Sequence, residues 1–407
     1  MPGSAIPARL AAWSTSSGSP AAGVADDPGE DAWGTSRRSR LFPGPFLAHA
    51  DLHNHTRFSD GKGDPALTFD SLRAAGLDAA AITDHARWGS LLLRHGPGAA
   101  GIDGRAWART RELADLADAP GEFVAMRGFE WSHAFYGHMN VWGSERYTEP
   151  YRTFGPGMGP LWRWLERRGG DGLVTFNHPG TGGRLRFGRF RLRPAMTQRL
   201  VGMEIFNKTR DYLFQGTDGR DASPLVECLD AGWRAGLLGV TDEHGADWGV
   251  PDGKGRAGLY VHELTRAGVL EALAARRVFA SRVKGLRLDV AVDGVRMGGT
   301  LPLERARPVR VEVDLDLGPA WWGRRLNLQV LRPGLRLPTL AAAVEVALPS
   351  PEEPVMSFEV DLDPADGPWL VLRVSDPSSP ADPRATGPWA ELGYALAYSS
   401  PFWLEVR

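Results

Sequence analysis

The chain has 407 residues, with 47 basic and 49 acidic side chains and a formal net charge of −2. Hydrophobic residues make up 43% and charged residues 24%, a balance typical of a globular protein with a buried core, and it gives no electrostatic case for nucleic acid or a membrane surface as partner. No apolar run approaches the roughly 18 residues of a membrane-spanning helix, and the single cysteine, Cys228, excludes an internal disulfide and favours the cytoplasm.

The N-terminal segment, residues 1–45, is rich in Ser, Gly, Pro and Ala and has no hydrophobic periodicity. A segment of this composition buries too little apolar surface to offset the entropy lost on ordering. We therefore predict that residues 1–45 are disordered or loosely attached.

Residues 46–283 alternate short apolar runs with helical patterns. The predicted strands are Phe46–His55, Ala79–Thr83, Phe123–Glu130, His138–Gly143, Leu173–Asn177, Val201–Asn207 and Leu237–Thr241. The predicted helices run from Asp64-Pro65 to Gly76, over Arg105–Ala119, around Leu161–Leu165, and over Leu225–Ala235 and Arg266–Arg277. This alternation favours an α/β fold with a mainly parallel sheet, and six or seven such units suggest a closed barrel.

Residues 284–407 change character, because the helical pattern stops and short β-type runs take over. The predicted strands are Arg287–Val292, Val309–Asp314, Leu326–Leu331, Val344–Leu348, Ser357–Leu362, Leu370–Val374 and Phe402–Val406. Turn residues such as Asp293-Gly294 separate them. About seven strands at this spacing predict a C-terminal, all-β, sandwich-like domain.

Histidines and carboxylates stand at the ends of the predicted barrel strands. The side chains at these positions are His53, His55, Asp60, Asp84, His85, Glu130, His138, His178, Asp242 and His244. Because the carboxyl ends of barrel strands meet at one mouth, we expect these side chains to converge there.

Imidazoles and carboxylates without a thiolate suit Zn²⁺, Mn²⁺ or Fe²⁺. Nine of these side chains, all except Asp84, are candidate ligands, and nine are too many for one ion. The sequence therefore predicts two or three divalent metal ions, with Glu130 able to bridge two of them. Such ions lower the pKa of a bound water, which supports hydrolysis through a metal-bound hydroxide without a Ser or Cys nucleophile.

Two motifs, Asp51–Gly61 and Gly76–His85, resemble the first motifs of the PHP (polymerase and histidinol phosphatase) superfamily. Glu130, His138, Asn177-His178-Pro179 and Asp242-x-His244 are similar to its later motifs. The two-domain length, Phe129-Glu130-Trp131 and the ending Ala397–Pro401 further resemble the branch that includes carbaryl hydrolase. The resemblance implies a distorted (β/α)7 TIM-like barrel with a two- or three-metal centre.

The resemblance also implies a role for each candidate residue. His53, His55, Glu130 and Asp242 would hold one ion, Asp60, His85 and His244 a second, and Glu130, His138 and His178 a third. Glu130 and Asp242 would bridge the ions or orient the metal hydroxide, and Asp84 would lie behind the ligands. Two departures are that position 60 is Asp where some members have His, and that Glu243 in the last motif has no assigned role.

Three functions are compatible with these residues, and all use a small-molecule partner. The leading one is a phosphoesterase for a small phosphomonoester or nucleotide, with Arg57, Lys208 and Arg210 as phosphate-binding cations. The alternative is an ester, amide or carbamate hydrolase with an aromatic-rich mouth made of Trp88, Trp131, Phe135, Tyr136, Trp142 and Trp248. A non-catalytic metal-binding protein is less favoured, because every expected position holds a competent ligand. The sequence leaves the oligomeric state open.

Overall fold

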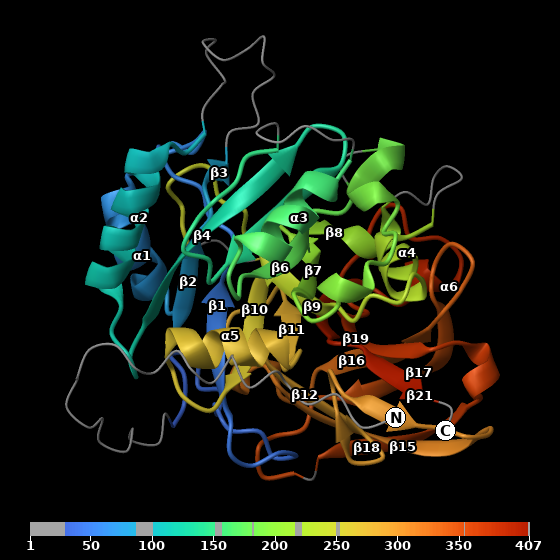
Figure 1. Ribbon diagram of the computed structural model, residues 1–407. Coiled ribbons are helices and arrows are strands. Elements are labelled where there is room, and N and C mark those ends of the chain that lie inside the picture. Colours follow the sequence, from blue (N-terminus) through green and yellow to red (C-terminus); the bar gives the residue numbers. More distant parts are fainter. Residues whose placement is uncertain are drawn as a thin grey trace.

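The computed structural model describes residues 29–86, 101–150, 157–180, 183–215, 222–249, 253–353 and 355–405. The protein is a mixed α/β structure in which helices surround the strands of the first part and strands dominate the second (Figure 1). The expected change of character near residue 284 falls between the strands β11 and β12.

The first part contains eleven strands among the described residues. They are β1 Phe46–Asp51, β2 Ala79–Ile82, β3 His85–Ala86, β4 Val124–His133, β5 Gly137–Trp142, β6 Leu173–Asn177, β7 Leu200–Asn207, β8 Arg210–Asp211, β9 Gly236–Val240, β10 Arg256–Val261 and β11 Val278–Ser281. Parallel pairing joins β1 to β2, β2 to β4, β6 to β7 and β7 to β9. Antiparallel pairing joins β4 to β5, β5 to β6, β1 to β10 and β10 to β11.

These pairings differ from a uniform series of seven βα units. The strands β4 and β5 form a hairpin without a crossover helix, and β10 and β11 run antiparallel to their neighbours. The sequence prediction missed β10 and β11, because short runs of mixed character around Gly258 and Val278 do not stand out from loop sequence.

The helices of this part are α1 Pro65–Ala74, α2 Gly104–Ala117, α3 Gly159–Arg167, α4 Pro224–Asp230 and α5 Arg266–Ala274. Their starts follow local chemistry. The Asp64 carboxylate accepts a hydrogen bond from the Ala66 N–H, and Pro65 occupies the first turn, where its missing N–H costs nothing. The Thr265 hydroxyl accepts from the Gly268 N–H at the start of α5. The predicted helix positions agree with these within a few residues.

Both faces of the inner strands are buried, which explains why their sequences read as continuous apolar runs. In β2, Ala79 and Ala81 pack in the interior beside Ala48 and Val124, whereas Ala80 and Ile82 pack on the other side against helices α1 and α2. Strands covered on both faces lose the alternation of polar and apolar residues. Polar residues interrupt the pattern mainly near the carboxyl ends, with His49, Thr175 and Glu204 as buried exceptions inside β1, β6 and β7.

The second part is built from two sheets. One contains β12 Arg287–Val292, β13 Val295–Arg296, β15 Arg307–Asp316 and β18 Met356–Leu362. The other contains β14 Thr300–Pro302, β16 Arg325–Arg332, β17 Thr339–Ala347, β19 Trp369–Asp376, β20 Tyr394–Ser399 and β21 Phe402–Glu405, with a short helix α6 Pro388–Glu391. Leu288 and Val313 from the first sheet share one core with Leu328 and Leu372 from the second. We refer to residues 284–405 as the β-domain.

The two parts share a hydrogen-bonded ladder. Strand β20 of the β-domain pairs antiparallel with β11, with Ala280 opposite Tyr398 and Ser281 opposite Ala397. Strand β20 was absent from the sequence prediction, although its residues Ala397–Ser399 belong to the ending noted there. The β-domain is therefore joined to the first part through the sheet as well as through side-chain packing.

Residues 29–45 differ from the loose attachment expected for the N-terminal segment. Arg37 pairs with Asp78 at 2.6 Å, the Asp31 carboxylate lies 3.3 Å from His49 Nε2, and Arg40 Nε lies 2.9 Å from Asp314 Oδ1. Buried acidic partners thus order this stretch, although its own composition is that of a disordered segment. Residues 1–28 lie outside the described part of the chain.

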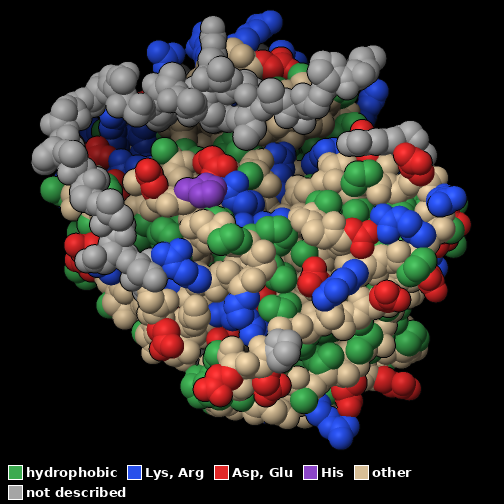
Figure 2. Space-filling view, turned by 90° about the horizontal axis from the view of Figure 1, so that it is seen from below, with side chains coloured by type: hydrophobic (Ala, Val, Ile, Leu, Met, Phe, Trp, Pro, Cys, Tyr) green, Lys and Arg blue, Asp and Glu red, His purple; other side chains and the backbone are tan. Residues whose placement is uncertain are grey.

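Figure 2 shows the face that lies below in Figure 1, on which acidic and basic side chains are interspersed and histidines are scarce. Most of the histidines gather instead at the opposite, carboxyl ends of the strands. Within the described ranges, no helix combines the length and apolar character that crossing a membrane requires.

Candidate metal centre

The nine predicted ligands converge in four overlapping groups, near the carboxyl ends of the strands or just after them, except that His138 lies at the amino end of the antiparallel strand β5. The groups are His55 with Asp60, His85 and His244; His53 with Glu130 and His178; His53 with His55 and Asp242; and His85 with Glu130 and His138. Within each group the candidate ligand atoms all lie within 4.8 Å of one another. The expected grouping into three sets is rearranged in detail, since His85 joins both Asp60 and Glu130. Their roles as ligands remain a prediction.

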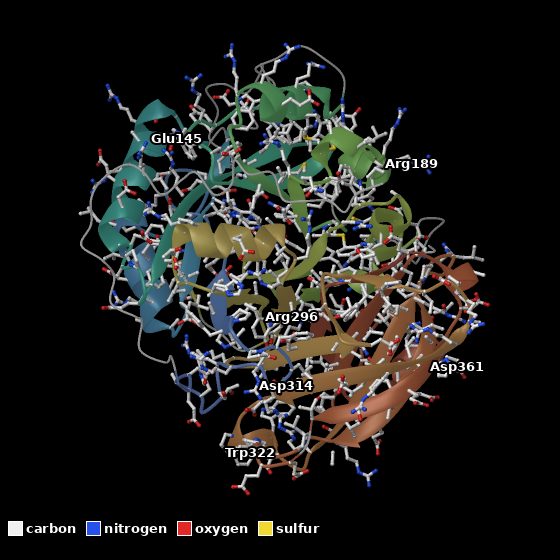
Figure 3. All side chains as sticks on the ribbon, turned by 60° about the horizontal axis from the view of Figure 1, so that its bottom comes forward. Glu145, Arg189, Arg296, Asp314, Trp322 and Asp361 are labelled. Carbon is white, nitrogen blue, oxygen red and sulfur yellow. The ribbon has the colours of Figure 1, made fainter. Side chains whose placement is uncertain are left out.

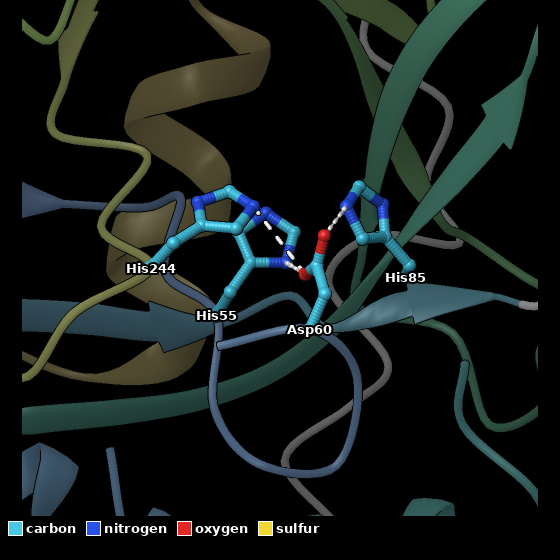
Figure 4. Close-up of side chains that lie close together, drawn as sticks. All are labelled: His55, Asp60, His85 and His244. Atoms are coloured by element: carbon cyan, nitrogen blue, oxygen red, sulfur yellow. Dashed lines mark ion pairs between the residues drawn. The ribbon is translucent and has the colours of Figure 1, made fainter. Parts of the chain in front are cut away.

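Asp60 lies between two imidazoles at the mouth (Figure 4). Its Oδ2 is 3.4 Å from His85 Nε2, and its Oδ1 is 3.4 Å from His244 Nε2 and 3.9 Å from His55 Nδ1. The carboxylate at position 60 therefore reaches all three imidazoles of its group. This half-exposed residue is compatible with a ligand at the outer edge of the cluster.

Glu130 is fully buried and lies at the centre of the cluster. Five imidazole nitrogens surround its two oxygens, those of His85 at 2.5 Å, His178 at 3.1 Å, His138 at 3.2 Å, His53 at 3.3 Å and His55 at 3.7 Å. In addition, the Nε2 atoms of His53 and His55 lie only 3.0 Å apart. One carboxylate cannot balance the charge of five protonated imidazoles. Unprotonated imidazole nitrogens and carboxylate oxygens gathered this closely are instead suitable ligands for divalent cations. The donor set therefore fits the predicted metal ions.

The cluster also perturbs the protonation of its members. Burial alone raises the pKa of Glu130, but the positive charges of His138, His85 and His53 outweigh it and hold that pKa well below its usual range. Burial lowers the pKa of His85, yet Glu130 and Asp60 raise it to about 10. Burial and the charge of His85 lower the pKa of His55 to about 3. Strong shifts of opposite sign in one cleft are typical of functional sites.

Glu204 is a supporting residue that the sequence prediction did not identify. Its Oε1 lies 2.7 Å from His53 Nδ1, and its Oε2 accepts hydrogen bonds from the His178 N–H at 2.6 Å and the Asn207 amide at 2.9 Å. A carboxylate on the far nitrogen of a ligating imidazole fixes the ring and its tautomer. The sequence does contain a signal for Glu204, since it is an acidic residue inside the apolar strand β7. A fully buried carboxylate of this kind requires a partner.

Asp84 organises the loop that carries His55 and Asp60. It accepts hydrogen bonds from the N–H and hydroxyl of Thr56, at 2.7 and 2.6 Å, and from the Ser59 hydroxyl at 2.5 Å. This arrangement is consistent with the predicted place of Asp84 behind the ligands.

Glu243, which had no assigned role, holds the Lys254 ammonium at 2.5 Å and accepts the Gly245 N–H at 2.6 Å. It therefore supports the loop after β9, next to Asp242 and His244.

Several residues of the mouth adopt a left-handed backbone that L-residues rarely occupy. His178, Asp242 and Lys208 have φ values of 29°, 48° and 52° and follow the strands β6, β9 and β7. Such conformations cost free energy and persist where the surroundings fix them, often at active sites. Three such residues surround one cleft. The contacts that place their side chains at the mouth therefore offset the free-energy cost of the left-handed backbone.

A cavity of about 450 Å³ opens over the cluster. Its lining includes His85, His133, His138, His178, Asp242, His244, Asn207, Lys208, Arg210 and Tyr212. Lys208 and Arg210 thus line the cavity, with Lys208 Nζ 3.5 Å from Asp242 Oδ2, and their role in binding phosphate stays a prediction. Arg57 does not line this cavity, because its exposed side chain pairs with Asp64 at 2.5 Å.

The expected aromatic-rich mouth is wrong for most of its residues. Trp131, Trp142 and Trp248 are buried in the core, and the Trp142 indole donates to the Leu52 carbonyl at 3.1 Å. Phe135 is exposed on the β4–β5 turn, Tyr136 is partly buried, and Trp88 lies outside the described residues. Nearness in sequence to the motifs did not place these rings in the cavity. Trp131 follows Glu130 on β4 and faces the opposite side of the strand, whereas Trp142 lies at the far end of β5 from His138.

No protein-family model matches this sequence, and no curated protein matches it either. Among solved structures, the chain is similar to a two-domain protein from Bacteroides vulgatus ATCC 8482 that contains a predicted PHP-like metal-dependent phosphoesterase, at 17% identity over 91% of this chain and 100% of that one, with a TM-score of 0.46.

Two further structures are similar over shorter stretches. A candidate metal-dependent phosphoesterase from Bifidobacterium adolescentis ATCC 15703 is 16% identical over 50% of this chain and 90% of that one, with a TM-score of 0.32. An amidohydrolase from Chromobacterium violaceum, with bound sulfate and no metal, is 15% identical over 58% of this chain and 98% of that one, with a TM-score of 0.28. The solved structures similar to this chain thus include PHP-like proteins.

Proposed function

We propose that this protein is a metal-dependent hydrolase of the PHP type, most simply a phosphoesterase for a small phosphomonoester or nucleotide, built on a distorted (β/α)7 barrel. The observation that carries the proposal is the convergence of nine His, Asp and Glu side chains around the buried Glu130. Two or three divalent ions bound there would supply Lewis acidity and an activated water.

The protein's own residues have separable tasks in this proposal. Glu130 and Asp242 supply negative charge at the centre of the cluster, and their depressed pKa values keep both ionised. Glu204 fixes the ring of His53, and Asp84 fixes the loop that carries His55 and Asp60. Each group is held by hydrogen bonds before a substrate arrives, so little reorganisation is needed at the moment of reaction.

Lys208 and Arg210 favour phosphate chemistry over carbonyl chemistry. Both line the cavity beside His178 and Asp242, and a phosphate group needs cationic partners in addition to metal ions. The aromatic surface expected for an aryl ester or carbamate is largely buried elsewhere. Carbonyl hydrolysis nevertheless remains the alternative that the same cluster could serve.

The test begins with metal content. Protein purified without chelator, with Mn²⁺ or Zn²⁺ supplied, should carry more than one equivalent of metal per chain; less than about half an equivalent would overturn the proposed centre. The loaded protein is then assayed against an aryl phosphate, a nucleotide, an aryl ester and a carbamate. Turnover of a phosphate substrate supports the proposal, whereas turnover of only the ester or carbamate would replace phosphoester chemistry by the alternative.

A further inference from the structure

The hairpin formed by β7 and β8 provides one side of the cavity. Phe206 pairs with Asp211 and Asn207 with Arg210, so Lys208 and Thr209 form the turn between the strands. Asn207, Lys208, Arg210 and Tyr212 all line the cavity, and Lys208 is the turn residue with the left-handed backbone. The hairpin therefore presents the two cations of the mouth on a strained turn.

Side chains beyond the hairpin hold its backbone and its buried acid. The Tyr398 hydroxyl donates to Asp211 Oδ2 at 2.9 Å, and the Arg384 guanidinium donates to the Asp211 carbonyl at 3.3 Å. Arg282 donates to the Thr209 carbonyl at 2.8 Å, and its own N–H donates to the Leu396 carbonyl of β20. Tyr398 and Arg384 belong to the β-domain, and Arg282 directly follows β11.

Tyr398 is itself held by Arg373 in the interior of the β-domain. Arg373 Nε lies 3.2 Å from the Tyr398 hydroxyl, and its other nitrogens donate to Gln329 at 2.8 Å and to the Gly393 carbonyl at 3.0 Å. Arg373, Gln329, Tyr398 and Asp211 are all essentially buried. Because a buried network with satisfied donors and acceptors has few alternative arrangements, it acts as a rigid brace.

The remaining contacts of the hairpin explain why such a brace is needed. The Lys208 side chain is about half exposed, and Arg210 is exposed. The left-handed backbone of the turn costs conformational free energy, which the turn would recover if it relaxed. Long cationic side chains also lose conformational entropy when they are held in place. The Asp211 carboxylate ties the hairpin to the β-domain by its hydrogen bond with Tyr398, and the Phe206 ring packs against the same tyrosine with ring centroids 5.1 Å apart. Asp211 Oδ1 also accepts the Leu213 N–H on the way to Tyr212.

We propose that the β-domain completes the substrate-binding side of the cavity, with Tyr398 and Arg373 as positioning residues that act through Asp211 on Lys208 and Arg210. This inference rests on the proposed phosphoesterase function for its substrate, an anionic phosphomonoester, and on the hydrogen bonds of the hairpin for its geometry. The β-domain is then a part of the binding site, although none of its own side chains lines the cavity.

The main test uses Tyr398→Phe, which keeps the ring and removes the hydroxyl. In the metal-loaded, full-length protein, KM for an aryl phosphate should rise about tenfold while kcat changes less than about threefold, the size expected when a hydrogen bond to a charged group is lost. Tyr260→Phe is the matched control, because Tyr260 is also fully buried and its hydroxyl has no hydrogen-bond partner among the described residues. Its KM should equal that of the wild type. An unchanged KM for Tyr398→Phe would overturn the proposal.

A second measurement does not depend on activity. Amide hydrogen exchange of the peptide that contains residues 206–211 should be faster in Tyr398→Phe and in Asp211→Asn than in the wild type and in Tyr260→Phe. If the phosphoesterase proposal fails, because the loaded wild type neither hydrolyses aryl phosphate nor binds inorganic phosphate, this exchange experiment still tests the brace. Equal exchange in all four proteins would overturn the brace even in an active phosphoesterase.

Discussion

Two buried clusters of charge occupy this molecule, and they are satisfied in different ways. In the β-domain, the Arg287 guanidinium meets Asp314 through two hydrogen bonds of 2.9 and 3.1 Å, and Arg296 meets Asp289 at 2.6 and 3.0 Å. Arg296 and Asp314 are labelled in Figure 3, where both lie on the β-domain strands. Planar guanidinium groups match carboxylates through paired hydrogen bonds, and Arg40 adds a further contact to Asp314 at 2.9 Å, so these charges are neutralised in place.

The cluster at the mouth has no such matching. Five imidazoles surround Glu130, and its ion-pair partners among the described residues are all histidines. The difference teaches that buried charge alone does not identify a metal centre. The useful distinction is between two kinds of cluster. In one, each charged side chain has an oppositely charged side chain as partner; in the other, nitrogen and oxygen atoms that could bind a metal ion lie close together without such partners.

The largest effect is expected for Glu130→Gln. Gln preserves the shape of the side chain and removes the charge at the centre of the cluster, so hydrolysis should fall more than about 100-fold, beyond the roughly 10–100-fold typical of residues that only orient a ligand. Steady-state kinetics and elemental analysis measure it, with Asp60→Asn expected to lose less. A Glu130→Gln protein that keeps full metal content and a tenth of the activity would show that Glu130 is not a shared ligand.

The contrasting variant in the β-domain is Arg296→Met, which removes the guanidinium that pairs with the fully buried Asp289 carboxylate. Breaking a buried ion pair by removing one partner typically costs about 3–5 kcal/mol, so the free energy of unfolding should fall by about that amount in a urea titration. Metal content and activity of the folded fraction should stay unchanged. Arg325→Met removes an exposed partner of Glu345 and should cost less than about 1 kcal/mol. Similar losses for the two variants would contradict this contrast.

A smaller effect is expected for Glu204→Gln, which weakens the orientation of His53 without removing a candidate ligand. Metal affinity should fall about 10–100-fold, as measured by competition with a chelator. Glu145→Gln changes an exposed carboxylate far from the candidate ligand groups and serves as control. Unchanged metal affinity for Glu204→Gln would mean that the 2.7 Å contact with His53 does not tune the site.

The smallest effect concerns the N-terminal segment. Removal of residues 1–28 should leave thermal stability unchanged, because Ser, Gly, Pro and Ala dominate their composition and large apolar residues are few. Removal of residues 1–40 also deletes Arg37 and Arg40, whose charge-assisted hydrogen bonds to Asp78 and Asp314 should cost about 1–3 kcal/mol when lost. Equal melting temperatures for the two truncations would show that residues 29–40 contribute nothing.

The sequence was informative where one residue type recurs in one structural setting. His53, His85 and His178 each stand near the end of a buried strand, so their convergence could be expected from the geometry of the sheet. It was less informative where a single residue carries the signal. Glu204 was missed because one polar residue does not break the apolar pattern of β7, and Asp31 and Arg40 acquire their order from partners that are distant in sequence.

The same reasoning explains the errors in the fold. The strands β10 and β20 pair with β1 and β11, which are more than a hundred residues away along the chain, so nothing in the local pattern announces them. The aromatic residues near the motifs were placed by proximity in sequence, whereas strand alternation turns Trp131 away from Glu130, and Trp142 lies at the end of β5 away from His138.

The ladder between β11 and β20 also affects the order in which the protein can be assembled. The ribosome makes β11 first, and its partner Ala397 follows Ser281 by more than a hundred residues, which at about 5–20 residues per second takes of the order of ten seconds. During that interval, the nascent first part of the chain exposes an unpaired sheet edge of the kind that other chains can join. The tyrosine that braces the hairpin arrives on the same late strand, so closing this edge and finishing the binding cavity are one event.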